Sequence, residues 1–151
     1  ARTVAHMIEY QIAFAVDTCL AGDTPADKNP IKLGKGVTLN AVDNMTLTNR
    51  GLLIYLEKLC QKHQIPYQIA CFMDGGTDAG NIYKSLEGIL ATTLSIPMRY
   101  MHTHQGILHK KDVEATLRLM KVLCQELTPE IYKQIMIENY RFQKGEGQCG
   151  E

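Results

Sequence analysis

The apolar segment from Gln11 to Leu20 constrains the fold of this chain more than any other part of the sequence. Its sequence, QIAFAVDTCL, is rich in strand-forming residues, and unbroken runs of this kind are typical of strands buried on both faces of a sheet. One carboxylate, Asp17, lies inside the run. The segment therefore predicts a buried β-strand that carries a single charged side chain.

Further strands and helices alternate along the rest of the chain. Apolar runs bounded by turn residues predict strands at 34–42, 67–73 and 92–101. Apolar residues at helical spacing, or a helix-capping residue after a turn, predict helices at 46–63, from Thr77 or Asp78 to about Ser85, at 111–127, and a last short helix from Pro129. Pro97 cannot donate to a strand ladder, so we expect it at an edge, an end or a bulge.

This alternation predicts an α/β fold with helices on both faces of a largely parallel or mixed sheet. The chain has 151 residues, of which 45% are hydrophobic and 21% charged, which is typical of one globular domain with a real core. No internal repeat is visible. We expect one domain over residues 1–143 and a flexible, glycine-rich tail over residues 144–151.

The charge balance and the cysteines exclude several classes of partner and environment. Sixteen basic residues offset sixteen acidic ones, so no net field attracts the chain to nucleic acid or to anionic lipid. Its apolar stretches are too short and too often interrupted to span a membrane, and the first residues show no signal peptide. Five scattered cysteines without a CxxC pair indicate mostly buried free thiols in a reducing cytoplasm.

Asp17 is the first candidate for chemistry. An ionised carboxylate inside a buried strand costs several kcal/mol unless it is paired, hydrogen-bonded or bound to a metal ion. Its place near the carboxyl end of the strand is where α/β proteins bind ligands. A strand-end aspartate that only accepts backbone hydrogen bonds is the more common arrangement, so from this residue alone a metal ligand stays a hypothesis.

A glycine-rich turn at 74–80, DGGTDAG, is the second candidate. A turn between a strand and a helix exposes backbone amides that bind an anion or a substrate carboxylate. The substrate-binding residues that we expect here are Gly75, Gly76, Thr77 and Asp78. A tight turn without a ligand is an equal alternative. A nucleotide-binding loop is a weaker one, because the sequence matches neither GxGxxG nor the P-loop.

The third candidate is the histidine pair His102 and His104 after the strand at 92–101, with His109 nearby. Histidine is a common zinc ligand, and a carboxylate from a neighbouring strand end can complete such a site. The HxH spacing is weak by itself, because loop histidines are more often solvated. His6 and His63 are expected at the surface.

Several segments in register resemble one known family. They are AVDTCLAGDTP around Asp17, KLGKG at 32–36, IPYQI at 65–69, GGTDAG at 75–80, SIPMRYMH at 95–102 and DVE at 112–114. In order and spacing they are similar to the glutamyl aminopeptidases, a family that includes the tetrahedral aminopeptidases and the proteins once called cellulase M. The resemblance covers nearly the whole chain.

This resemblance implies a three-layer α/β/α catalytic domain with two divalent metal ions, zinc or cobalt, bridged by an aspartate. Asp17 resembles the aspartate that binds one ion, and His102 resembles the histidine that binds the other. The first histidine, the bridging aspartate and the glutamate pair that includes the general base correspond to positions before Ala1. No catalytic residue of the family is therefore expected in this chain, which would form part of a peptide-hydrolysing aminopeptidase.

The resemblance leaves two hypotheses about the chain by itself. In the first it is the carboxyl-terminal portion of an aminopeptidase catalytic domain, inactive alone and completed by an amino-terminal chain that restores peptide hydrolysis. In the second it is a truncated, non-catalytic relative that serves binding or assembly. Both predict an exposed apolar surface and favour homo-oligomers. The sequence HTHQG at 102–106 departs from the HS and later glutamate of relatives, which predicts an altered wall beside the site.

Overall fold

A mixed β-sheet forms the middle layer of the chain in a computed structural model that describes residues 1–25, 29–85 and 88–143. Its strand order is β1-β4-β2-β3, with β5 paired to β4. β1 runs parallel to β4 and β2 parallel to β3, whereas β2 and β5 run antiparallel to β4. The strands are β1 (Ile12–Leu20), β2 (Val37–Val42), β3 (Tyr67–Cys71), β4 (Leu90–Arg99) and β5 (Ile107–Leu108).

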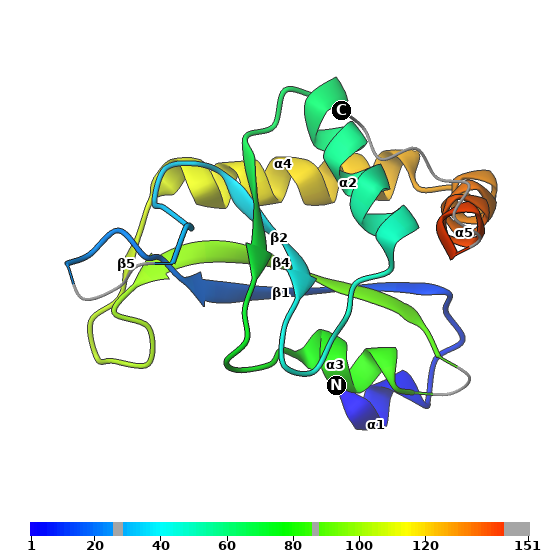
Figure 1. Ribbon diagram of the computed structural model, residues 1–151, viewed down its shortest axis with the longest axis horizontal. Coiled ribbons are helices and arrows are strands. Elements are labelled where there is room, and N and C mark those ends of the chain that lie inside the picture. The colour runs from blue at the N-terminus through cyan, green and yellow to red at the C-terminus, as the bar shows by residue number, and fades with distance from the viewer. Residues whose placement is uncertain (26–28, 86–87, 144–151) are drawn as a thin grey trace.

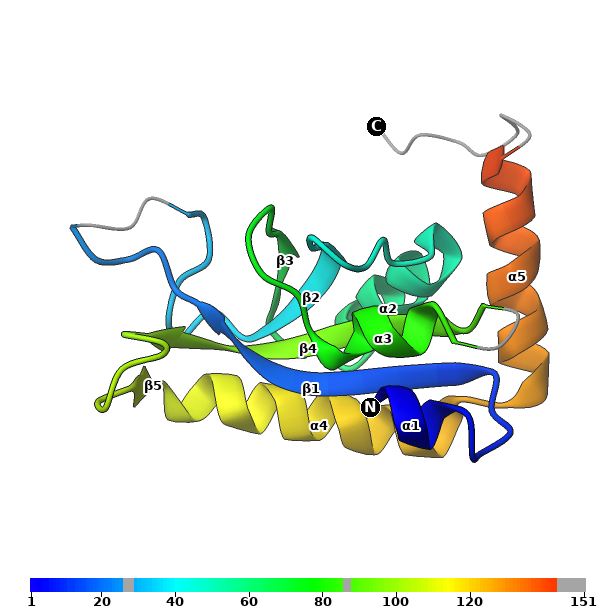
Figure 2. The ribbon, with the colours of Figure 1, turned by 90° about the horizontal axis from the view of Figure 1, so that it is seen from below.

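Helices cover both faces of this sheet, which confirms the expected three-layer α/β/α fold. In Figure 1, α2 and α4 lie above β1 and β4, and α1 and α3 lie below them. Figure 2, seen from below, has α1 and α3 in front of the same two strands. The helices are α1 (Arg2–Ala5), α2 (Arg50–Lys62), α3 (Asp78–Tyr83), α4 (Lys110–Glu126) and α5 (Pro129–Gln143). The tail expected at 144–151 lies outside the described residues.

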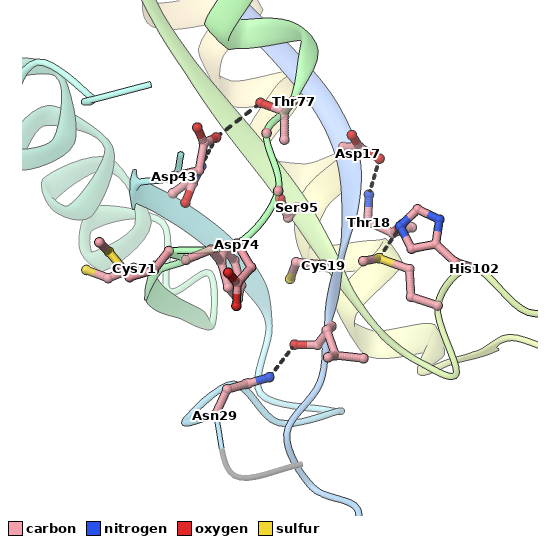
Figure 3. Close-up of a pocket in the computed structure, with 17 residues that line it drawn as sticks. Asp17, Thr18, Cys19, Asn29, Asp43, Cys71, Asp74, Thr77, Ser95 and His102 are labelled. Carbon is pink, nitrogen blue, oxygen red and sulfur yellow. Dashed lines mark hydrogen bonds between the residues drawn. The ribbon is translucent and has the colours of Figure 1, made fainter. Parts of the chain in front are cut away.

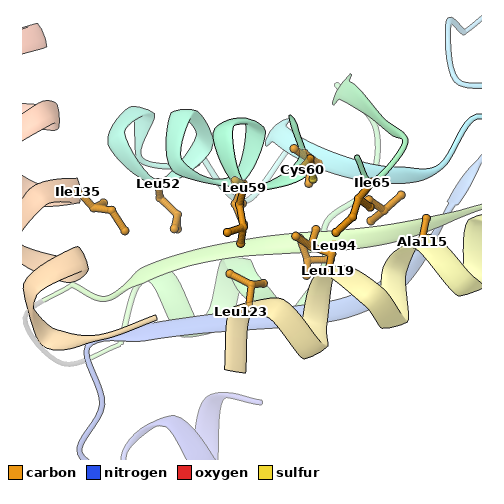
Figure 4. Close-up of a cluster of buried hydrophobic side chains, with 12 residues drawn as sticks. Leu52, Leu59, Cys60, Ile65, Leu94, Ala115, Leu119, Leu123 and Ile135 are labelled. Carbon is orange, nitrogen blue, oxygen red and sulfur yellow. The ribbon is translucent and has the colours of Figure 1, made fainter. Parts of the chain in front are cut away.

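The main hydrophobic core lies between the sheet and the layer of α2 and α4 (Figure 4). Side chains alternate between the two faces of a strand, so Val37 and Leu39 of β2 and Leu94 of β4 enter this core and are fully buried. Burying one such side chain contributes about 1.5–3 kcal/mol. Leucines from α2 and α4 and Ile135 from α5 complete the cluster. The same alternation directs Thr38, Asn40 and Ser95 to the opposite face.

The helix boundaries follow local capping. α2 begins at Arg50 rather than at Thr46, because the Asp43 carboxylate accepts the backbone N–H groups of Met45 and Thr46 in a turn at 2.8 and 2.7 Å. The Asn49 side chain then caps α2 by accepting from the Leu52 N–H group at 3.1 Å. α5 is 15 residues long, so the expectation of a short last helix is wrong; its Ile135 is buried against α2 and the core.

β1 does not have both faces and both edges covered, so the expectation of a doubly buried strand is wrong. It pairs with β4 alone and stands at the edge of the described sheet. Val16 is 47% exposed and Asp17 is exposed as well. An apolar run indicates which residues favour a strand, but it does not determine how many neighbouring strands pair with that strand. Cys71 and Cys124 are likewise exposed, whereas Cys19 and Cys60 are buried as expected.

Pro97 lies inside β4, but outside the residues of β4 that pair with β2 and with β5. The backbone N–H group that proline lacks is therefore not needed for either pairing. β2 pairs with β4 at Leu94 and Ser95, and β5 pairs with it at Met98 and Arg99. Pro97 falls between these two pairings while it faces Cys19 of β1. The expectation of an edge, an end or a bulge is therefore wrong, because β4 is an interior strand of the sheet. It accommodates Pro97 because this residue falls between the segments that pair with β2 and with β5.

Asp112 holds the loop before β2 against the first turn of α4. Its side chain is fully buried and accepts the backbone N–H groups of Gly34 and Gly36, each at 2.7 Å. Gly36 has a φ of +101°, and a Cβ there would lie 1.9 Å from the Pro66 carbonyl oxygen, so only glycine fits. This contact joins two segments, 32–36 and 112–114, that are distant in the sequence.

We expect Asp112→Ala to lower the free energy of unfolding by roughly 3 kcal/mol, because the buried N–H group of Gly36 and the partly buried one of Gly34 lose a charged acceptor. Urea denaturation followed by circular dichroism measures this change. Glu114→Ala, on the exposed side of the same helix, is the matched control and should stay within about 0.5 kcal/mol of the wild type. Equal losses in the two variants would contradict the anchoring role of Asp112.

Candidate metal and substrate pocket

A pocket of about 590 Å³ lies on the face of the sheet opposite the apolar core. Alternation along the strands places polar side chains there: Asp17 and Cys19 of β1, Asn40 of β2 and Ser95 of β4. Figure 3 shows Asp43, Cys71 and Asp74 on one side of the pocket and Asp17, Thr18 and His102 on the other. The remaining lining residues are Leu20, Asn29, Phe72, Met73, Gly75, Gly76, Thr77 and Met101.

Asp17 lines this pocket in an exposed position. Its Oδ1 atom accepts the backbone N–H group of Thr18 at 2.7 Å, and its register partner on β4 is Ser95. Because the side chain is exposed, the desolvation cost expected of a carboxylate in a buried strand does not arise. The carboxylate has room to accept a further ligand from the pocket.

His102 lines the same pocket from the loop that follows β4. Tyr100 and His102 both have positive φ angles, 57° and 62°, in the left-handed region that is costly for residues other than glycine. The Thr103 hydroxyl donates to the Tyr100 carbonyl at 2.7 Å, and the Thr18 hydroxyl contacts the Met101 sulfur at 3.6 Å. These contacts hold a strained turn that presents His102 beside β1.

Of the three histidines in this region, His102 alone belongs to the pocket lining. His104 is exposed and outside the lining. The His109 side chain caps α4, because its Nδ1 atom accepts the backbone N–H group of Lys111 at 3.1 Å. The HxH spacing at 102–104 therefore does not bring both imidazoles to one place.

The turn after β3 supplies the third wall. Gly75, Gly76 and Thr77 line the pocket, whereas Asp78 is the first residue of α3 and lies outside the lining. Thr77 is the N-cap residue, as expected, but its hydroxyl contacts Asp43 and Thr93 instead of capping the helix. These contacts join the turn to Asp43, directly after β2, and to Thr93 within β4.

Sequence reasoning missed two residues at the centre of this arrangement, Asn40 and Asp43. Asp43 is 7% exposed, and its carboxylate accepts the Asn40 amide at 2.8 Å in addition to the two backbone N–H groups of its turn. The signal was present: an asparagine within an apolar strand and an aspartate directly after it. The same pattern drew attention to Asp17.

An ion pair closes the carboxyl ends of β1 and β4. Arg99 donates from Nε and Nη2 to the two carboxylate oxygens of Asp23, at 2.7 and 2.8 Å. The Leu33 N–H group donates to the same carboxylate at 3.2 Å. The hydrogen bonds from Arg99 lower the pKa of Asp23 to about 2. Two parallel hydrogen bonds fix direction as well as distance, so this pair orients the strand end three residues before His102.

The donor set of the described residues fits only part of a metal centre. A carboxylate and an imidazole, from Asp17 and His102, are the ligand types that zinc takes. Across the ranges that the structure describes, however, no group of three or more histidine, cysteine, aspartate or glutamate side chains gathers in one place. Stable zinc sites use three or four protein ligands, so these two residues alone do not form one.

The fold is an α/β domain with a pocket on one face of its mixed sheet, lined by residues of β1, β2 and β4 and of the loops that follow these strands. The sequence profile of the M42 glutamyl aminopeptidases matches residues 1–119. The chain belongs to this family.

Individual relatives agree with this assignment. The chain is 32% identical over 133 residues to the putative aminopeptidase FrvX of Escherichia coli, which covers 86% of the chain and 37% of that protein. It is 33% identical over 132 residues to the lysyl aminopeptidase of Pyrococcus furiosus, with 85% and 37% covered. The chain thus spans little more than a third of the length of these curated relatives.

Solved structures show the same fold. The TET aminopeptidase of a marine sediment thaumarchaeon superposes with a TM-score of 0.85 at 32% identity, over 89% of this chain and 38% of that one. The TET1 peptidase of Pyrococcus horikoshii, described as assembling into a tetrahedron or a large octahedral shell, gives a TM-score of 0.73 at 31% identity, over 83% and 36%. Among the described residues, no helix is long and apolar enough to cross a membrane.

We expect the Asp23–Arg99 pair to make stability depend on pH in the acid range. The pKa of Asp23 is lowered from 3.8 to about 2 in the folded chain, so the pair stabilises the fold above pH 4. This stabilisation is lost as the pH falls from about 4 towards 2. Urea unfolding of the wild type and of Asp23→Asn at a series of pH values measures the difference. A difference that stayed constant down to pH 2 would contradict the ion pair.

Proposed function

We propose that this chain forms the carboxyl-terminal part of the catalytic domain of a metal-dependent aminopeptidase, with residues 1–143 as the folded unit. In this proposal Asp17 binds one of two divalent ions and His102 binds the other. The site removes amino-terminal residues from peptides once the remaining ligands are supplied. Membership of the M42 family supports the aminopeptidase assignment.

One observation carries the proposal: Asp17 and His102, which come from separate segments of the sequence, line the same pocket. Asp17 lies in β1 and His102 in the loop after β4, and these two strands are parallel neighbours, so their carboxyl ends meet at one edge of the sheet. Thr18 and Met101, the residues next to them, are in contact. This arrangement suits two metal ligands that belong to one centre.

In this chemistry the chain's own residues hold the metal ions and position the substrate. Bound divalent ions of this class acidify a water molecule and polarise the scissile carbonyl group. The Asp17 carboxylate is already oriented by the Thr18 N–H group, and the backbone of the loop after β4 determines where His102 stands. Gly75, Gly76 and Thr77 would contact the substrate backbone, and Asp78 at the start of α3 would contribute through its charge.

We further propose that the chain works as part of an oligomer or with a complementing amino-terminal chain. Val4, Met7 and Ile8, which precede β1 in the sequence, are all more than half exposed, and Val16 of the edge strand β1 is also exposed. Exposed apolar groups next to an unpaired strand edge favour association. Relatives that are described as a dodecamer and as a tetrahedron support this expectation.

The chain alone should hydrolyse little or no aminoacyl anilide, since its described residues gather fewer than three metal-binding side chains. Mixed with an amino-terminal portion from a family member and with Zn²⁺ or Co²⁺, it should become active. Removing a residue that only hydrogen-bonds to a metal ligand typically lowers activity by about 10–100-fold. Asp17→Asn or His102→Ala removes a ligand itself and should therefore reduce kcat/KM by more than this. Release of the anilide chromophore measures the rate.

The matched control is His104→Ala, which removes a neighbouring imidazole that lies outside the pocket. It should keep the restored activity. A complex that forms, as shown by sedimentation, and yet hydrolyses nothing would contradict the peptidase proposal and favour a non-catalytic binding or assembly role.

A further inference from the structure

One side of the pocket is negatively charged. Asp43 and Asp74 line it, and the described lining residues include no lysine or arginine. Asp43 is nearly buried, and the partners of its carboxylate are two backbone N–H groups, the Asn40 amide and the Thr77 hydroxyl, none of which is charged. A charge held in low-dielectric surroundings acts on a ligand more strongly than one in water.

Asn40 adds an unused acceptor to the same side. It is 2% exposed, and its Nδ2 atom donates to Asp43 at 2.8 Å. This hydrogen bond determines which end of the amide faces the aspartate, because a carboxylate can only accept. The Oδ1 atom is left buried without a hydrogen-bond partner among the described residues, although the residue lines the pocket. A buried acceptor of this kind requires a donor.

Asp74 provides a carboxylate that is available to a ligand. The residue is exposed at the pocket, and no hydrogen bond or ion pair engages its side chain within the described part of the chain. In Figure 3 its carboxylate lies on the same side as Asp43 and across from Cys19. Two carboxylates and one free carbonyl oxygen thus lie on one side of a pocket whose described lining includes no lysine or arginine.

We propose that this side of the pocket, defined by Asn40, Asp43 and Asp74, binds the cationic side chain of a lysine or arginine at the amino end of a peptide. The proposal rests on the proposed function, because it takes a peptide as the ligand. An ammonium or guanidinium group donates a hydrogen bond to the unpartnered Asn40 oxygen, and its positive charge balances the negative charge of the two carboxylates. A pocket of about 590 Å³ is within the usual range for a small ligand.

The same arrangement disfavours an acidic side chain. A glutamate or aspartate carboxylate would face Asp43 and Asp74 and would offer the Asn40 oxygen no donor. Like charges placed opposite one another without a compensating cation repel. The family name refers to glutamyl substrates, so this pocket predicts a member of the family with the opposite charge preference.

Binding can be measured on the chain itself, with a chelator present so that metal ions play no part. Isothermal titration with L-lysinamide and with L-norleucinamide compares two ligands that share the α-ammonium group and differ in the charged end of the side chain. We expect lysinamide to bind at least about tenfold more tightly, as one charge-assisted hydrogen bond provides. In two-dimensional NMR, lysinamide should shift the Asn40 side-chain amide signal and norleucinamide should not.

The test variants are Asp74→Asn and Asp74→Lys, at an exposed side chain whose replacement we expect to leave the fold intact. The first should weaken lysinamide binding several-fold, and the second should abolish its advantage over norleucinamide. Glu114→Gln removes a carboxylate on α4, outside the lining, and should leave both affinities unchanged. The Asn40 signal shows that the variants are folded.

Equal binding of the two amides by the wild type would show that the α-ammonium group is what binds, and it would overturn the proposal. Unchanged lysinamide binding by Asp74→Lys, or tighter binding of glutamic acid amide than of lysinamide, would also overturn it. These results are independent of hydrolysis. A chain that discriminates the amides but gives no activity on complementation would keep the cation site and lose the peptidase proposal.

Discussion

The alternation of side chains along β2 and β4 is the constraint on which the rest of the structure depends. Val37, Leu39 and Leu94 enter the core with α2 and α4, and this burial determines which face each intervening residue must occupy. Asn40 and Ser95 consequently line the pocket. A shift of one residue in either strand would turn the polar side chains into the apolar core and the apolar ones into the pocket, so the apolar packing specifies the position of the site.

Around this sheet, single carboxylates hold the irregular segments. Asp112 fixes the loop before β2, Asp43 forms the turn before α2, and Asp23 pairs with Arg99 at the end of β4. Each of them accepts more than one hydrogen bond, which allows a short side chain to fix several backbone groups at once. The left-handed turn at Tyr100 and His102 persists because such contacts surround it.

Prediction from the sequence succeeded where the signal is local and failed where it depends on neighbours. The strand around Asp17, the existence of helix α4 and the N-cap position of Thr77 follow from periodicity and turn chemistry. The periodicity of α4 favoured a face with Leu117 and Met120, however, and both are exposed, whereas Leu119 is buried. The exposure of β1 and the length of α5 do not, because they depend on which elements pack against them. Asn40 and Asp43 were missed because their importance arises from a contact between them and from the pocket they share.

The sequence by itself determined the α/β class, the order of its elements and the family. Hydrophobic periodicity and the order of motifs can be read along the chain without knowing which residues are in contact. Only the tertiary structure decided that Asp17 and His102 share a pocket while His104 and His109 stand outside it. It also brought Asn40, Asp43 and Asp74 to one side of this pocket, whose described lining includes no lysine or arginine. The physical reason is that periodicity specifies the face of an element, whereas proximity between distant segments is set by packing and by strand order.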